Sequence, residues 1–170
     1  MKAGQLIIFW EDERSMKKGK KLVISALTLI MSLFGASSAF AYDGWADSLP
    51  TAYSLNGPIS GVSTTINSSA DVDWFSWTNN TGRAVSWNAT LQSPAGKNYD
   101  LHMVLQIGTS YLSMGSASDN GPGAIDSPGG GISPGNTIYF QVRGQTPSDF
   151  SETALYTLNF TFSWLNNYTS

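Results

Sequence analysis

Residues 156–164 alternate between large apolar and polar side chains, and this pattern constrains the fold more than any other feature of the sequence. In Tyr156-Thr-Leu-Asn-Phe-Thr-Phe-Ser-Trp164 every second residue is aromatic or aliphatic, and each residue between is Ser, Thr or Asn. Successive side chains of a β-strand point to opposite faces, so the segment predicts a strand with one buried and one solvated face. No long segment shows helical spacing of its apolar residues.

Further segments have the same period of two and are rich in aromatic and β-branched residues. They predict strands at 74–78, 85–91, 101–106 and 137–143, and a weaker one at 59–66. Strands at such spacings, with turn-forming residues between them, are typical of an antiparallel β-sandwich.

Residues 116–136 differ from the rest because they contain six glycines and three prolines. Such a composition predicts either a long surface loop or a pair of short, irregular edge strands.

The N-terminal 41 residues have the layout of a secretory signal peptide. Four lysines within 17–21 precede an apolar run, Leu22 to Phe34, and Ala39-Phe-Ala41 follows. A run of about 13 residues is shorter than the roughly 20 that span a bilayer, which argues against a membrane anchor. We expect residues 1–41 to be an N-terminal extension and a cleaved leader, with Met16 as an alternative start, and residues 42–170 to be one secreted domain.

The expected secreted part is acidic and lacks cysteine. Residues 42–170 hold three basic and nine acidic residues, a net charge of −6, against −3 for the whole chain. An acidic domain is not expected to bind nucleic acid, and no membrane contact is expected after cleavage. The absence of cysteine excludes disulfide scaffolds and cysteine-ligated metal centres.

Four segments in order resemble the bacterial pre-peptidase C-terminal domain, a family related to the collagen-binding domains of clostridial collagenases. They are Asp71-Val-Asp-Trp-Phe75, Tyr99-Asp-Leu-His-Met103, Gly135-Asn-Thr-Ile-Tyr-Phe-Gln-Val142 and Tyr156-Thr-Leu158. The resemblance implies a jelly-roll-like β-sandwich that binds or assists rather than catalyses. The family usually follows a secreted hydrolase, and no such enzyme is attached here.

Asp71 and Asp73 are the first candidate site residues, as ligands of calcium. Residues i and i+2 of an extended segment point the same way, so their carboxylates converge. Calcium takes six to eight oxygens, which Asp43, Asp47 and backbone carbonyls would help to supply. The resemblance supports this set, because the collagen-binding members hold calcium with the Asp-x-Asp region and an upstream acidic cluster. The alternative is that Asp71 caps a turn and Asp73 leads into the strand.

Aromatic side chains are the candidates for contact with a ligand. If Phe75 and Trp77 share the buried face of their strand, Trp74 is exposed or lies at an edge. Trp45 and Tyr111 are further candidates for exposure. Exposed rings stack on sugars or on apolar groups of a partner, and the alternative is that these rings belong to the core.

Asp100 and His102 share a face of their expected strand, and a nearby serine would complete a hydrolytic triad. No nucleophile-elbow motif accompanies them, so a hydrolase is the weakest reading and we expect no enzyme.

These features together predict a secreted bacterial binding module for an extracellular polysaccharide or protein polymer, with calcium stabilising its N-terminal segment. The alternative is a secreted matrix protein that self-associates through a sheet edge or the glycine-rich segment.

Overall fold

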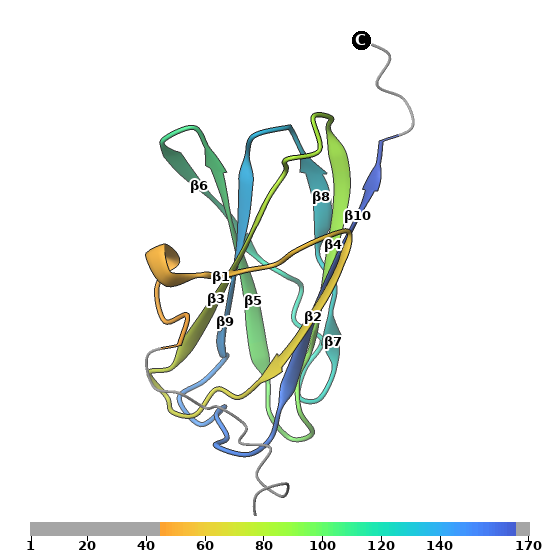
Figure 1. Cartoon of the computed structure of the whole chain (residues 1–170). Coiled ribbons are helices and arrows are strands. Elements are labelled where there is room, and N and C mark those ends of the chain that lie inside the picture. Colours follow the sequence, from red (N-terminus) through yellow and green to blue (C-terminus); the bar gives the residue numbers. More distant parts are fainter. Residues whose placement is uncertain (1–44, 166–170) are drawn as a thin grey trace, which may run out of the picture. The chain divides into compact units, whose positions relative to one another are not determined.

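The computed structural model describes residues 45–165, which form two β-sheets with a shared core (Figure 1). The expected leader and Asp43 lie outside the described residues. No helix within residues 45–165 is long and apolar enough to cross a bilayer.

One 3-10 helix and ten strands follow one another in the described part. They are η1 (Leu49–Thr51), β1 (Tyr53–Ser54), β2 (Ile59–Thr64), β3 (Val72–Thr78), β4 (Val85–Gln92), β5 (Tyr99–Ile107), β6 (Ser110–Ser116), β7 (Ile125–Asp126), β8 (Gly129–Ile132), β9 (Thr137–Gly144) and β10 (Tyr156–Trp164).

The strands form two five-stranded sheets. Sheet A has the order β1-β3-β9-β5-β6, and sheet B has the order β2-β10-β4-β7 with β8 also on β4. All neighbours are antiparallel except β1, which runs parallel to β3. The expected all-β, antiparallel sandwich is thereby confirmed, with β1 as a short parallel addition.

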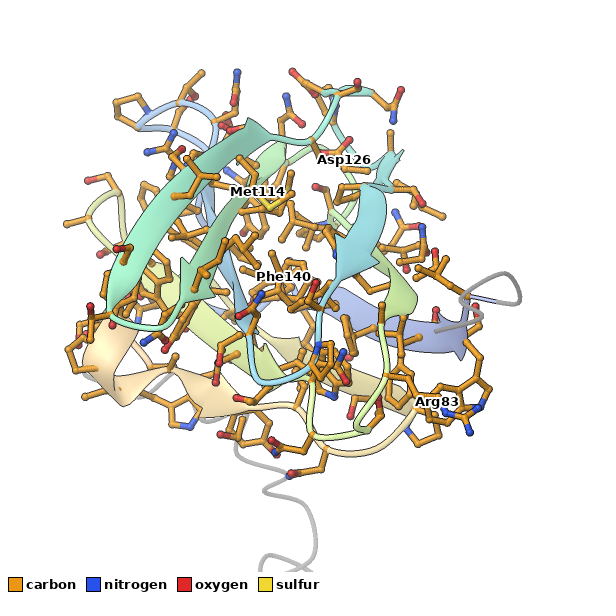
Figure 2. The ribbon with its side chains drawn as sticks, turned by 90° about the horizontal axis from the view of Figure 1, so that it is seen from above. Arg83, Met114, Asp126 and Phe140 are labelled. Carbon is orange, nitrogen blue, oxygen red and sulfur yellow. The ribbon has the colours of Figure 1, made fainter. Side chains whose placement is uncertain are left out.

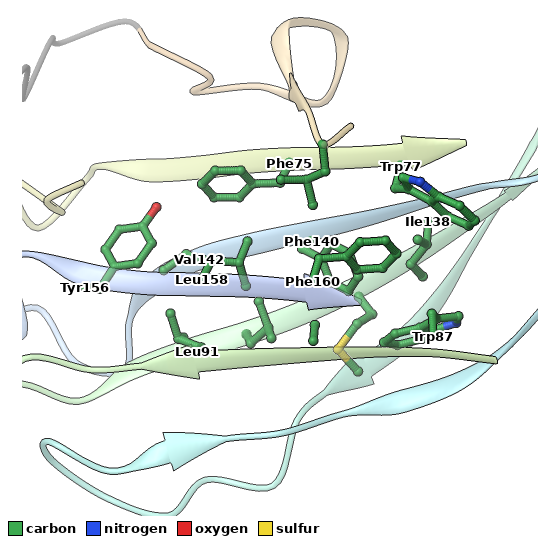
Figure 3. Packing of buried hydrophobic residues seen from close by; sticks show 14 of the residues in the cluster. Phe75, Trp77, Trp87, Leu91, Ile138, Phe140, Val142, Tyr156, Leu158 and Phe160 are labelled. Carbon is green, nitrogen blue, oxygen red and sulfur yellow. The ribbon is translucent and has the colours of Figure 1, made fainter. Parts of the chain in front are cut away.

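The core lies between the inner faces of the two sheets. On β10 the alternation holds as expected, because Tyr156, Leu158 and Phe160 are fully buried. Phe140 of β9 packs against Phe160 with ring centroids 5.6 Å apart, and Figure 3 shows these rings among the buried side chains of both sheets. Figure 2 likewise places Phe140 at the centre of the sandwich. Aromatic packing of this kind stabilises a domain that has no cross-links.

The glycine-rich segment contains β7 and β8, so a long loop over 116–136 is wrong and the alternative of short edge strands is present. β8 pairs with β4, and Gly130 lies directly opposite Trp87. A Cβ at Gly130 would stand 3.3 Å from the Trp87 ring. Glycine therefore lets the backbone of β8 lie against a buried indole, which explains why this strand lacks the alternation of the others.

Candidate functional site

Three of the four aspartates expected to bind calcium lie together at one end of β3. Single carboxylate oxygens of Asp47, Asp71 and Asp73 are all within 4.8 Å of one another. Asp73 belongs to β3 and Asp71 precedes it by two residues, as the extended backbone requires. Asp47 reaches the cluster because the N–H of Trp74 donates a 2.7 Å hydrogen bond to the carbonyl of Ala46.

Asp73 is the buried member of the cluster, with 3% of its surface exposed. Its carboxylate accepts a 2.6 Å hydrogen bond from the hydroxyl of Tyr156 on β10. Burial raises the pKa of Asp73 from 3.8 to about 7; the hydrogen bond opposes this shift, and the charges of Asp71 and Asp47 add to it. A nearby cation, or protonation, would therefore stabilise this buried carboxyl group.

The surroundings of the cluster are polar and partly buried. Asp71 accepts a 2.7 Å hydrogen bond from the backbone N–H of Asn67, which holds the loop before β3. The buried hydroxyl of Tyr99 has no hydrogen-bond partner among the described residues. Burial, followed by the charges of Asp149, Asp71 and Asp73, raises the pKa of Tyr99 to about 12.

This donor set fits calcium in kind. Calcium prefers several carboxylates together with neutral oxygens, and the cluster supplies three carboxylates. When bound, calcium would neutralise the mutual repulsion of the carboxylates and tie the N-terminal segment to β3. Asp47, Asp71 and Asp73 would be the residues that hold it.

A second feature is the outer face of sheet A, the side turned away from the core. Strand register places three rows of its side chains across β3, β9, β5 and β6. The rows are Trp74–Gln141–His102–Ser116, Ser76–Tyr139–Val104–Ser113 and Thr78–Thr137–Gln106–Tyr111. These twelve residues, which we call the outer face, include no Asp, Glu, Lys or Arg. A shorter row, Val72–Arg143–Asp100, lies beside them, and its two charged side chains pair with each other.

Three aromatic residues lie on the outer face, one in each row. Tyr111 is 55% exposed, and its ring centroid is 6.2 Å from that of half-buried Tyr139. The Tyr139 hydroxyl donates a 3.0 Å hydrogen bond to the side-chain oxygen of Gln106, which fixes the ring. Trp74 is half-buried on this face, since Phe75 and Trp77 occupy the core. The outer face thus combines rings for stacking with amides and hydroxyls for hydrogen bonds.

Trp45 does not join this face. Its ring lies 5.3 Å from that of Tyr53 and 5.9 Å from that of buried Phe75, so it packs against the core. Trp45 is half-buried rather than fully exposed, because the Ala46–Trp74 hydrogen bond draws this segment onto β3. Its contact with a ligand stays a prediction.

His102 lies between two serines. Its Nδ1 is 3.3 Å from the Ser116 hydroxyl, and its Nε2 is 3.1 Å from that of Ser113. Asp100 instead lies 3.8 Å from Nη2 of Arg143 and accepts a hydrogen bond from the Gln145 side-chain amide. A triad needs a carboxylate on the second ring nitrogen, and serine occupies that position.

The sequence did not single out Tyr139, Gln106 or Gln141 as site residues. The signal was nevertheless present, because alternation in 137–143 assigns Ile138, Phe140 and Val142 to the core and therefore turns Tyr139 and Gln141 outward.

No protein-family model matches this chain, and no curated protein matches it. Among solved structures, a mitogen derived from Yersinia pseudotuberculosis is 18% identical with a TM-score of 0.45, over 61% of this chain and 84% of that chain. The pre-peptidase C-terminal domain of a Bacillus anthracis collagenase is 15% identical with a TM-score of 0.41, over 65% of this chain and 90% of that chain. A periplasmic inhibitor of g-type lysozyme from Aeromonas hydrophila is 10% identical with a TM-score of 0.39, over 66% and 96%.

With every TM-score below 0.5 and every identity below 20%, these likenesses establish neither a family nor a function. The expected resemblance to the pre-peptidase C-terminal domain is therefore matched only weakly, and only at the level of the fold.

Proposed function

We propose that this chain is a secreted, non-catalytic module that binds an extracellular polymer across the outer face of sheet A. The observation that carries the proposal is the placement of Trp74, Tyr139 and Tyr111 in successive rows of the outer face, whose twelve residues include no Asp, Glu, Lys or Arg. Aromatic rings offer flat apolar area to a ligand, and the neighbouring amides and hydroxyls fix its orientation.

An uncharged polysaccharide fits this face better than a charged polymer. The twelve outer-face residues offer no ion-pair partner, and the acidic domain repels anionic polymers at long range. Sugar rings present apolar faces for stacking and hydroxyls for Gln106 and Gln141. A protein polymer such as collagen is the competing partner, and the experiment below separates the two.

Calcium, in this proposal, acts as a structural ion. Asp47 and Asp71 would be held to Asp73 by the shared cation, which would order the segment that covers β3. The outer face itself would not contact the ion, so binding of the polymer would depend on calcium only through the stability of the domain.

Co-sedimentation of the protein with insoluble cellulose, chitin, peptidoglycan and collagen, in calcium and in EDTA, tests the proposal. We expect saturable binding to one of the polysaccharides, with EDTA lowering thermal stability more than affinity. Binding to collagen alone would assign the face to a protein polymer. Absence of binding to all four would overturn the proposal.

A further inference from the structure

The hairpin of β5 and β6 leaves one edge of sheet A without a partner. β6 is the last strand of the sheet, and no described strand pairs with its outer side. Four of the ten exposed large apolar side chains in the described part lie on this hairpin, namely Ile107, Tyr111, Leu112 and Met114; Figure 2 shows Met114 on β6. Proteins usually blunt such an edge with charged residues or proline.

This edge lacks those protections. Residues 103–118 contain no Asp, Glu, Lys, Arg or Pro. The expected secreted domain has a net charge of −6, so two copies repel each other where their acidic surfaces meet. The β6 edge is a place where a second copy approaches without opposing like charges, whereas a charged partner would find no complementary charge there.

The backbone geometry of β6 is self-complementary. The two-residue turn at Gly108 and Thr109 makes Ile107–Ser110 the hydrogen-bonded closing pair. By the alternation of an antiparallel ladder, Tyr111 and Ser113 then direct their N–H and C=O groups away from β5. At Met114 the ladder with β5 shifts register, and Gly115 has a φ of +86°, so the regular alternation of outward N–H and C=O groups is interrupted there.

We propose that two copies of this chain pair through β6, antiparallel and about a two-fold axis at Leu112. Tyr111 of each copy then exchanges backbone hydrogen bonds with Ser113 of the other. Leu112, 58% exposed in one copy and opposite Leu105 on the inner face, meets Leu112 of the second copy. The pairing joins the two A sheets and brings both outer faces side by side, but it does not depend on what those faces bind.

A single cysteine at the axis tests the geometry, because the chain has none of its own. In protein expressed from the full chain, Leu112→Cys is expected to form a disulfide-linked dimer under mild oxidation at least about tenfold faster than Leu155→Cys. Leu155 is exposed to a similar extent but lies outside the hairpin. Equal rates for the two variants would overturn the proposal.

Sedimentation velocity tests the association without a covalent link. We expect concentration-dependent dimers for the unmodified protein and for Leu155→Lys, and monomers for Leu112→Lys with an unchanged circular dichroism spectrum. A protein that is monomeric at every concentration, or dimers that survive Leu112→Lys, would contradict pairing through β6. If the protein is monomeric and Leu112→Lys instead loses polymer binding, the edge serves a ligand and not a second copy.

Discussion

The hydroxyl of Tyr156 donates a 2.6 Å hydrogen bond to the buried carboxylate of Asp73, and this bond joins sheet B to sheet A beneath the aspartate cluster. Tyr156 lies on β10 and is fully buried, so the bond is shielded from water. Hydrogen bonds to a charged group in such surroundings are strong, and the charge itself is costly without them. One member of the candidate calcium site, Asp73, is therefore anchored in the core of the sandwich, whereas Asp47 is exposed and Asp71 is half-buried.

The raised pKa of Asp73 predicts a particular dependence of stability on pH in the absence of calcium. The folded pKa of about 7 exceeds the ordinary value of 3.8, so the folded protein binds the extra proton between these values. Stability is therefore highest at low pH with respect to this group and falls as the pH rises toward 7. Between pH 5 and pH 8 in EDTA we expect a loss on the order of 3 kcal/mol from this group.

Urea unfolding of the unmodified protein and of Asp73→Asn at the two pH values checks this prediction. Asp73→Asn has no proton to lose, so its free energy of unfolding should fall by less than that of the unmodified protein. Parallel pH profiles for the two proteins would show that Asp73 titrates normally.

Calcium is expected to bind more tightly as the pH rises through 7. The ion competes with the proton on Asp73, so its affinity should fall by about tenfold per pH unit below the pKa of that group. Isothermal titration calorimetry at pH 6 and pH 8 measures this difference. Asp71→Asn should weaken binding strongly, whereas Glu152→Gln, which alters an exposed residue outside the cluster, should not. Unchanged calcium affinity in Asp71→Asn would show that the aspartate cluster is not a calcium site.

Tyr156→Phe is expected to destabilise the protein by about 1–3 kcal/mol and to raise the pKa of Asp73 further, because the lost hydrogen bond favours the charged carboxylate. Calcium affinity at pH 7 should fall with it. Tyr139→Phe is the matched control, since it also removes a tyrosine hydroxyl bond but on the outer face. Chemical unfolding measures the stability of both variants, and calorimetry measures their calcium affinity. Equal losses of stability and of calcium affinity in the two variants would contradict this account.

Gly144→Ala is expected to destabilise the domain by about 2 kcal/mol or more. A Cβ at Gly144 would overlap the backbone carbonyl oxygen of Asp149, and backbone has little freedom to move away. Gly131→Ala is the control on another strand, because the nearest atom to its Cβ would stand at an ordinary 3.9 Å. Thermal unfolding compares the two; similar melting temperatures would show that the 144–149 turn adapts freely.

The sequence predicts those strands whose two faces meet different surroundings. β4 and β10 alternate because one face is core and the other is water, and their bounds lie close to the expected ones. β6 was not expected, because both of its faces are largely exposed and its side chains carry little alternation. β8 was left ambiguous, because its glycines serve the packing of Trp87 and not a hydrophobic pattern.

The candidate site was likewise predictable only in part. The convergence of Asp71 and Asp73 was predictable from local geometry, since it depends only on the i, i+2 spacing in a strand. The burial of Asp73 against Tyr156 was not predictable, because the two residues are 83 positions apart and meet only through sheet packing. The contact of Trp45 with Phe75 was not predictable for a similar reason, because it arises only in the tertiary structure.

The most direct test of the central claim is a depletion isotherm of Tyr111→Ala on the polymer that the unmodified protein binds, with Phe150→Ala as the control. Both side chains are exposed aromatics, but only Tyr111 lies on the outer face. We predict about tenfold weaker binding for Tyr111→Ala and unchanged binding for Phe150→Ala. Equal affinity of Tyr111→Ala and the unmodified protein would contradict binding across the outer face.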